Sequence, residues 1–192
     1  TGDSKMKCYH GTTLKNFVNL LNGGDKPEGI WNCSYMDDCF YVYPMDKVVK
    51  MECLEDEEVS YIRERCIQNA LESGLITASF QMETQDVIII EMDIPEEELE
   101  DDYSCDNMSD IASFTGHFDK DWIIGIHSAK FSAMYAPFFV PDATNRNLGY
   151  VDEDLLSIAK IVQNSGDSSV YCDLLDKITA SLTERNLSDF LG

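Results

Sequence analysis

The stretch that decides the fold is Met6-Lys7-Cys8-Tyr9-His10-Gly11-Thr12-Thr13, followed directly by residues 14–24. Residues 7–10 are short and half apolar, as is typical of a β-strand, and a glycine follows them. Next come two hydroxyl side chains that can cap a helix, and then apolar residues at helical spacing: Leu14, Phe17, Val18, Leu20 and Leu21. Asn22-Gly23-Gly24 tolerates positive φ and ends the pattern. The sequence therefore predicts a strand, a tight turn and one amphipathic helix.

This order places His10 at the end of a strand, beside a helix N-terminus. Backbone N–H groups at such a terminus can hold an anionic ligand. The chain contains three histidines, at positions 10, 117 and 127. His10 is therefore the histidine best placed for a functional role, although a lone histidine is more often structural.

A second pattern lies further along the chain. Met36-Asp37-Asp38-Cys39-Phe40-Tyr41-Val42-Tyr43-Pro44 contains a β-prone run that ends at a proline. Tyr9-His10-Gly11-Thr12 before a short helix, together with this Phe-Tyr strand, resembles the ADP-ribosyltransferase fold in its His-Tyr-acid branch. The resemblance covers about the first third of the chain by motif and the middle third by element order. It implies an α+β fold, with a split mixed β-sheet and flanking helices.

The resemblance also implies roles for individual residues. His10 and Thr12 would hold the ribose of NAD, with Gly11 beside them. Tyr41 would stack on the nicotinamide ring, and Tyr43 is the alternative. The family's catalytic Glu would begin a strand near residue 121, where this chain has none. Asp119 or Asp121 would replace it with a side chain one methylene shorter, and His117 is another polar candidate.

Two further elements are clear from periodicity. Glu55-Asp56-Glu57-Glu58 opens a helix with acids that complement its dipole, and a buried stripe follows up to Leu71. Asp86–Ile94 carries a continuous apolar run, which predicts a central strand buried on both faces. A strand is also expected at 122–126, and the segment 135–141 is expected to form the closing edge strand.

The C-terminal part contains a second helical pattern. Residues 142–149 are rich in turn-forming types and indicate a boundary. Two amphipathic helices follow, which predict an αα-hairpin with a short tail at 187–191. The expected organisation is residues 1–5 as a tag or linker, 6–141 as the main domain, and 150–192 as the hairpin packed on it.

Charge is the outlying property of the composition. The chain has 36 acidic and 14 basic residues, for a net charge of −22. Direct nucleic-acid binding is not expected, because affinity for that backbone comes from Lys and Arg. No Lys or Arg occurs between Cys66 and Asp119, a stretch that holds 14 acids. The densest run is Glu96-Glu97-Glu98-Leu99-Glu100-Asp101-Asp102, which is expected to be a short helix or a mobile loop.

The cysteine pattern and the hydropathy indicate which compartment and which kinds of site to expect. The seven cysteines are odd in number and lack CxxC spacing, so no metal site is expected and a reduced, cytoplasmic protein is the simplest interpretation. No run approaches the roughly 18 apolar residues of a membrane helix. A monomer without a membrane partner is expected.

Two functions follow from these patterns. The first is an enzyme that transfers ADP-ribose from NAD to a macromolecule. The second is a non-catalytic acidic inhibitor of phage type, which would occupy the basic channel of a nucleic-acid enzyme such as a CRISPR effector and so mimic nucleic acid. In the second function, residues 96–102 apart from Leu99 would contact a basic protein target: Glu96, Glu97, Glu98, Glu100, Asp101 and Asp102.

Overall fold

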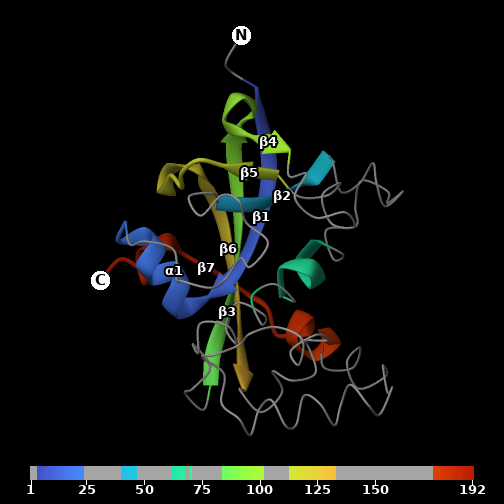
Figure 1. The fold of residues 1–192 in the computed structure, drawn as a ribbon. Coiled ribbons are helices and arrows are strands. Elements are labelled where there is room, and N and C mark those ends of the chain that lie inside the picture. Colours follow the sequence, from blue (N-terminus) through green and yellow to red (C-terminus); the bar gives the residue numbers. More distant parts are fainter. Residues whose placement is uncertain are drawn as a thin grey trace, which may run out of the picture.

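The structure is a computed structural model that describes residues 4–23, 40–46, 62–67, 70, 84–101, 113–132 and 175–192. These residues form an α+β arrangement built around one long sheet (Figure 1). The strands and the named helix are β1 (Lys5–Thr13), α1 (Leu14–Leu21), β2 (Phe40–Pro44), β3 (Thr84–Pro95), β4 (Glu100–Asp101), β5 (Ser113–Thr115), β6 (Ile123–Ser132) and β7 (Thr183–Arg185). Single 3₁₀ turns lie at η2 (Glu96–Glu98), η3 (Lys120–Trp122) and η5 (Leu187–Asp189).

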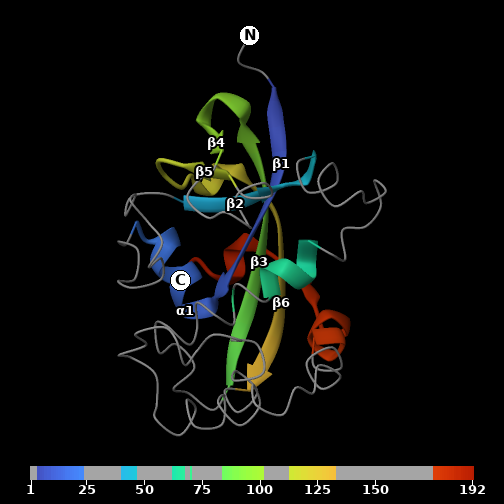
Figure 2. The ribbon, with the colours of Figure 1, turned by 45° about the vertical axis from the view of Figure 1, so that its right-hand side comes forward.

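The seven described strands follow the order β4-β5-β2-β1-β3-β6-β7. Every recorded pair is antiparallel, so the mixed sheet expected from the sequence is not found in the described part of the chain. β1, β3 and β6 are long and run together, whereas β2, β5 and β4 cross them near one end (Figure 2). β1 pairs with β3 along its whole length but with β2 only at Cys8 and Tyr9.

The predicted central strand is confirmed. Residues Val87 to Ile90 of β3 are all buried, and β3 is flanked by β1 on one side and β6 on the other. An apolar run without alternation suits this position, because both faces of β3 are covered. Pro95 is its last residue, as expected.

The first element differs from its prediction. β1 continues through Gly11 and Thr12 without a turn and ends at Thr13, whose side chain accepts a hydrogen bond from the Asn16 N–H and caps α1. His10 is therefore three residues inside the strand and not at its end. The strand is prolonged because Gly11, Thr12 and Thr13 each pair with β3. The predicted helix end is confirmed at Asn22 and Gly23, where Gly23 has φ 72°.

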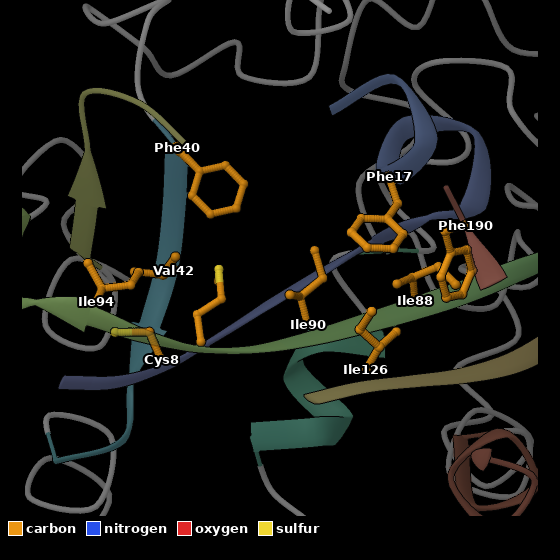
Figure 3. Packing of buried hydrophobic residues seen from close by; sticks show 10 residues of the cluster. Cys8, Phe17, Phe40, Val42, Ile88, Ile90, Ile94, Ile126 and Phe190 are labelled. Atoms are coloured by element: carbon orange, nitrogen blue, oxygen red, sulfur yellow. The ribbon is translucent and has the colours of Figure 1, made fainter. Parts of the chain in front are cut away.

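The side chains divide the sheet into two faces, because neighbouring residues of a strand point to opposite sides. One side, here called the α1 face, carries a cluster of buried apolar residues to which α1 contributes Phe17 and the C-terminal segment contributes Phe190 (Figure 3). The other side, here called the Arg63 face, lies under the helical segment 62–67 and carries Tyr9, Gly11 and His127.

The acidic run and the C-terminal part agree with the expectations only in part. Glu96–Glu98 is a short 3₁₀ helix, one of the two expected forms, whereas Glu100–Asp101 makes a short strand that was not expected; Asp102 lies outside the described residues. Residues 175–180 are helical, as expected for the second helix of the hairpin, but Thr183–Arg185 then pairs with β6 as a strand that was not expected. The tail docks through Phe190, whose ring packs against that of Phe17. The expected strand at 135–141 and the first helix of the hairpin lie outside the described residues.

Two residues of the expected tag or linker are tied into the sheet. Lys5 pairs with Pro95, and the Ser4 hydroxyl donates to Glu96 at 2.8 Å. These two residues, which were expected to belong to a tag or linker, therefore contact the folded part of the chain.

Candidate functional site

His10 is held in one orientation by the neighbouring strand. Its Nδ1 lies 2.6 Å from the main-chain carbonyl oxygen of Tyr41. A carbonyl oxygen only accepts, so Nδ1 carries the proton and donates, and Nε2 is the acceptor nitrogen of the neutral ring. The side chain is half-buried on the α1 face, in line with Cys8 and Thr12. The strand pair thus fixes both the tautomer and the direction of the ring.

Aromatic contacts connect His10 to two other parts of the chain. The His10 and Phe40 rings are 4.3 Å apart between centroids, and the Phe40 and Phe118 rings are 5.2 Å apart. Phe40 is buried, and Phe118 is partly buried against the same apolar cluster. The three stretches from which the sequence predicts a site, around residues 10, 40 and 119, therefore converge at one place.

The two tyrosines do not share the face of His10. Phe40 and Val42 belong to the α1-face cluster, so the alternation of β2 directs Tyr41 and Tyr43 to the Arg63 face. Tyr43 is paired there with Tyr9. The structure brings the Tyr41 carbonyl to His10, while the Tyr41 ring leaves the sheet on the other side.

Gly11 and Thr12 follow His10 in β1 and point to opposite faces. A Cβ atom on Gly11 would lie 1.9 Å from the carbonyl oxygen of Cys66, so only glycine fits under segment 62–67. Thr12 is buried on the α1 face opposite Ile88. Beyond Tyr9, no described residue of β2 pairs with β1, so the backbone of Gly11–Thr13 lacks a ladder partner in the described part of that side.

The two aspartates lie in the turn that follows Phe118. The Asp119 carboxylate accepts a hydrogen bond from the Asp121 N–H at 2.9 Å and caps the 3₁₀ turn η3. Asp119 is half-buried and Asp121 is exposed. The acid closest in sequence to the aromatic contacts is therefore Asp119.

The acidic run forms a separate surface at the β4 edge of the described sheet. Glu96, Glu97, Glu100 and Asp101 are exposed, and Glu98 lies 3.8 Å from Nδ1 of His117. His117 in turn packs on Trp122, with 5.0 Å between ring centroids, and its main chain exchanges hydrogen bonds with the Thr115 hydroxyl. Of these carboxylates, that of Glu98 thus lies beside an exposed histidine.

Two buried groups near His10 are unsuitable as nucleophiles. Burial raises the pKa of the Cys8 thiol to about 12, with a smaller contribution from Asp93 and Asp46. Burial and the nearby Glu91 raise the pKa of the Tyr9 phenol to about 12. Both groups stay protonated at neutral pH, so chemistry at this site depends on His10 and on carboxylates.

Sequence reasoning missed several polar and aromatic contacts. Phe40 contacts His10 and Phe118 contacts Phe40. Alternation along 40–44 indicates that Phe40 and Tyr41 lie on opposite faces, but only the structure shows that Phe40 is the one on the His10 face. The pair formed by Arg63 and His127, described below, had no signal in the sequence because 64 residues separate its members.

Neither a metal nor a membrane segment is recognised in the described part of the chain. Within those ranges no group of three or more His, Cys, Asp or Glu side chains is arranged to hold a metal ion. No helix within them is long and apolar enough to cross a membrane. No protein-family model, curated protein or solved structure matches this chain.

Proposed function

We propose that this chain is an ADP-ribosyltransferase-like protein that transfers ADP-ribose from NAD to a macromolecular target, with its nucleotide site around His10. The observation that carries the proposal is the contact series from His10 through Phe40 to Phe118. It joins three stretches that the resemblance names independently and that lie far apart in the sequence. The limited pairing of β1 with β2 supports the split form of the sheet.

His10 supplies the polar contact of the proposed site. With Nδ1 donating to the Tyr41 carbonyl, Nε2 accepts a hydrogen bond from a ribose hydroxyl. On the side away from β3, where the described part of β2 does not pair with Gly11–Thr13, this backbone offers N–H and C=O groups to a carboxamide, which has the same donor and acceptor types as a peptide. Tyr41 contributes its carbonyl, and Phe40 and Phe118 provide aromatic surface on the His10 face.

The reaction needs a carboxylate where positive charge develops on the ribose. Breaking the bond between nicotinamide and ribose gives an oxocarbenium-like transition state, which a nearby anion stabilises. Asp119 is the first candidate because it directly follows Phe118 and is half-buried, and Asp121 is the second. In this proposal the catalytic and cofactor-binding residues are His10, Gly11, Thr12, the main chain of Tyr41, and one of the two aspartates, whereas the Tyr43 ring lies on the other face and is not part of the site.

Calorimetric titration with NAD tests the proposal. Wild-type protein at pH 7.5 should bind NAD saturably, and His10→Ala should weaken binding about tenfold or more, the effect of losing one hydrogen bond of roughly 1.4 kcal/mol. His127→Gln is the matched control, because His127 lies on the Arg63 face and Gln keeps a neutral acceptor there. Absence of binding at millimolar NAD, or equal binding by His10→Ala, would contradict the proposal.

A second function is favoured by the acidic surface around η2 and β4. Its carboxylates are exposed, no Lys or Arg occurs in residues 84–101, and β4 is an edge of the described sheet. We propose as the alternative that this surface binds the basic channel of a nucleic-acid-binding protein without catalysis. Such an interaction is steered by charge and weakens with salt.

Charge reversal distinguishes the alternative from the transferase. A Glu96→Lys, Glu97→Lys, Glu100→Lys variant should lose capture of a basic nucleic-acid enzyme at low salt, while His10→Ala retains it. Asp46→Lys with Asp176→Lys is the control, because both are exposed acids outside this surface. If the triple variant captures the basic protein as well as the wild type does, this surface is not the binding site.

A further inference from the structure

A row of four residues crosses the sheet on the Arg63 face. Gly11 of β1 is paired with Ile89 of β3, Ile89 is paired with His127 of β6, and His127 is paired with Glu184 of β7. Directly opposite residues in antiparallel strands project to the same side. The four residues therefore form one line from the strand of His10 to the β7 edge.

The helical segment 62–67 is attached to this row at two points. The Cys66 carbonyl oxygen occupies the space that a Cβ of Gly11 would fill. Nη2 of Arg63 lies 3.4 Å from Nε2 of His127. Arg63 and Cys66 are three residues apart, so they lie on the same side of the helix. One helical turn thus spans the sheet from Gly11 to His127.

The contact between Arg63 and His127 requires a neutral histidine. A guanidinium can only donate hydrogen bonds, so Nε2 of His127 must accept, and the ring proton is on Nδ1. In the described part of the chain Nε of Arg63 is buried without a hydrogen-bond partner. His127 therefore provides the guanidinium with an acceptor in a place where polar partners are scarce.

The charged groups that face His127 come from three elements. Arg63 approaches from segment 62–67, Glu184 from β7 and Glu91 from β3, where Glu91 is also paired with Lys7 at 3.1 Å. Burial first, and Arg63 second, lower the pKa of His127, against the smaller opposite effects of Glu184 and Glu91. The ring is thus neutral at neutral pH. On protonation, Nε2 of His127 can no longer accept a hydrogen bond from Arg63. The imidazolium then lies beside the Arg63 cation and is attracted to Glu184 on the next strand.

We propose that His127 is an acid-released latch, which holds segment 62–67 on the sheet while neutral and lets the segment detach from the sheet when protonated. Detachment exposes the buried Cys66 and removes the support over Gly11. Because Gly11 is the neighbour of His10, acid then loosens the strand that carries the candidate site. The latch is a property of the fold and does not depend on the proposed transfer activity.

Hydrogen–deuterium exchange on the full chain tests the latch. Peptides that cover 62–67 and peptides that cover 86–92 of β3 are followed from pH 7.5 to pH 5, with each rate divided by the intrinsic rate at that pH. The variants are His127→Gln, which keeps a neutral acceptor at every pH, and His117→Gln, which removes an exposed histidine elsewhere.

The latch predicts a several-fold loss of protection in 62–67 on acidification of the wild type and of His117→Gln, with β3 unchanged. His127→Gln should keep its protection across the range. An equal loss in His127→Gln would overturn the proposal. Loss of protection in β3 to the same extent as in 62–67 would overturn it as well, because that pattern indicates unfolding of the whole sheet.

Discussion

The two faces of the sheet are built on different principles, although the same strands supply both. On the α1 face, Ile88, Ile90 and Met92 pack with Phe17 and Phe190, so volume and apolar area determine stability. The Arg63 face combines apolar residues with Glu91, His127 and Arg63 under a single helical turn. Its stability therefore depends on close backbone approach and on protonation state. The strand β1 belongs to both faces, with His10 on one and Gly11 on the other.

The largest effect is expected on the α1 face. Phe17→Ala removes a fully buried ring from the centre of the cluster and should lower the free energy of unfolding by about 4 kcal/mol. Leu191→Ala is the control, since Leu191 is 48% exposed, and it should change stability by less than about 0.5 kcal/mol. Urea denaturation measures both variants. A cost below about 1 kcal/mol for Phe17→Ala would show that this face is not the main core.

The next effect belongs to the Arg63 face. Gly11→Ala places a methyl group against the Cys66 carbonyl, which is backbone and cannot rotate away, so a cost of about 3 kcal/mol is expected. Gly125→Ala on the same face meets the flexible Glu91 side chain at 3.4 Å and should cost less than about 1 kcal/mol. Equal denaturation midpoints for the two variants would mean that segment 62–67 does not press on Gly11.

A smaller effect is expected where β1 passes into α1. Thr13→Ala removes the side-chain oxygen that caps α1 and should cost about 1 kcal/mol. Thr13→Asn keeps a capping oxygen and should restore most of that loss. Thermal unfolding followed by circular dichroism compares the three proteins, and a wild-type midpoint for Thr13→Ala would exclude the cap as a stabilising contact.

The smallest effect is a dependence of stability on pH that arises from His127. Its pKa is lowered in the folded state, so below its ordinary value of 6.5 the unfolded chain binds more protons than the folded one. Stability from this residue is therefore complete above pH 6.5 and falls as the pH drops towards the folded-state pKa. The difference in urea midpoint between wild type and His127→Gln should change in this window. A difference that stays constant from pH 7.5 to pH 5 would contradict the assignment.

Parts of the fold were predictable because their determinants are local. The apolar run Val87–Ile90 identified the central strand, the two hydroxyl residues before Leu14 indicated a helix cap, which Thr13 supplies, and Pro44 and Pro95 identified strand ends. The position at which β1 ends is not determined by the local sequence, because pairing with β3 continues the strand through Gly11 and Thr12. Likewise, Glu100–Asp101 is a poor strand by propensity and is paired because β5 lies beside it.

The candidate site was predictable only as a set of segments. The motifs named His10, Tyr41 and Asp119, and the structure brings their three segments together. Which side chains meet depends on the alternation of β2, which turns Phe40 to His10 and Tyr41 away. The short strand Thr183–Arg185 and the contact of Arg63 with His127 depend on residues more than 50 positions apart, and no local pattern indicates them.

The most direct test of the central proposal is the NMR signal of the His10 imidazole during titration with NAD. The chain has three histidines, so three ring signals are expected and His127 serves as an internal reference on the opposite face. We expect the His10 signal to shift saturably at pH 7.5 and the His127 signal to stay unchanged. A His10 signal that does not move at millimolar NAD would contradict a nucleotide site at this residue.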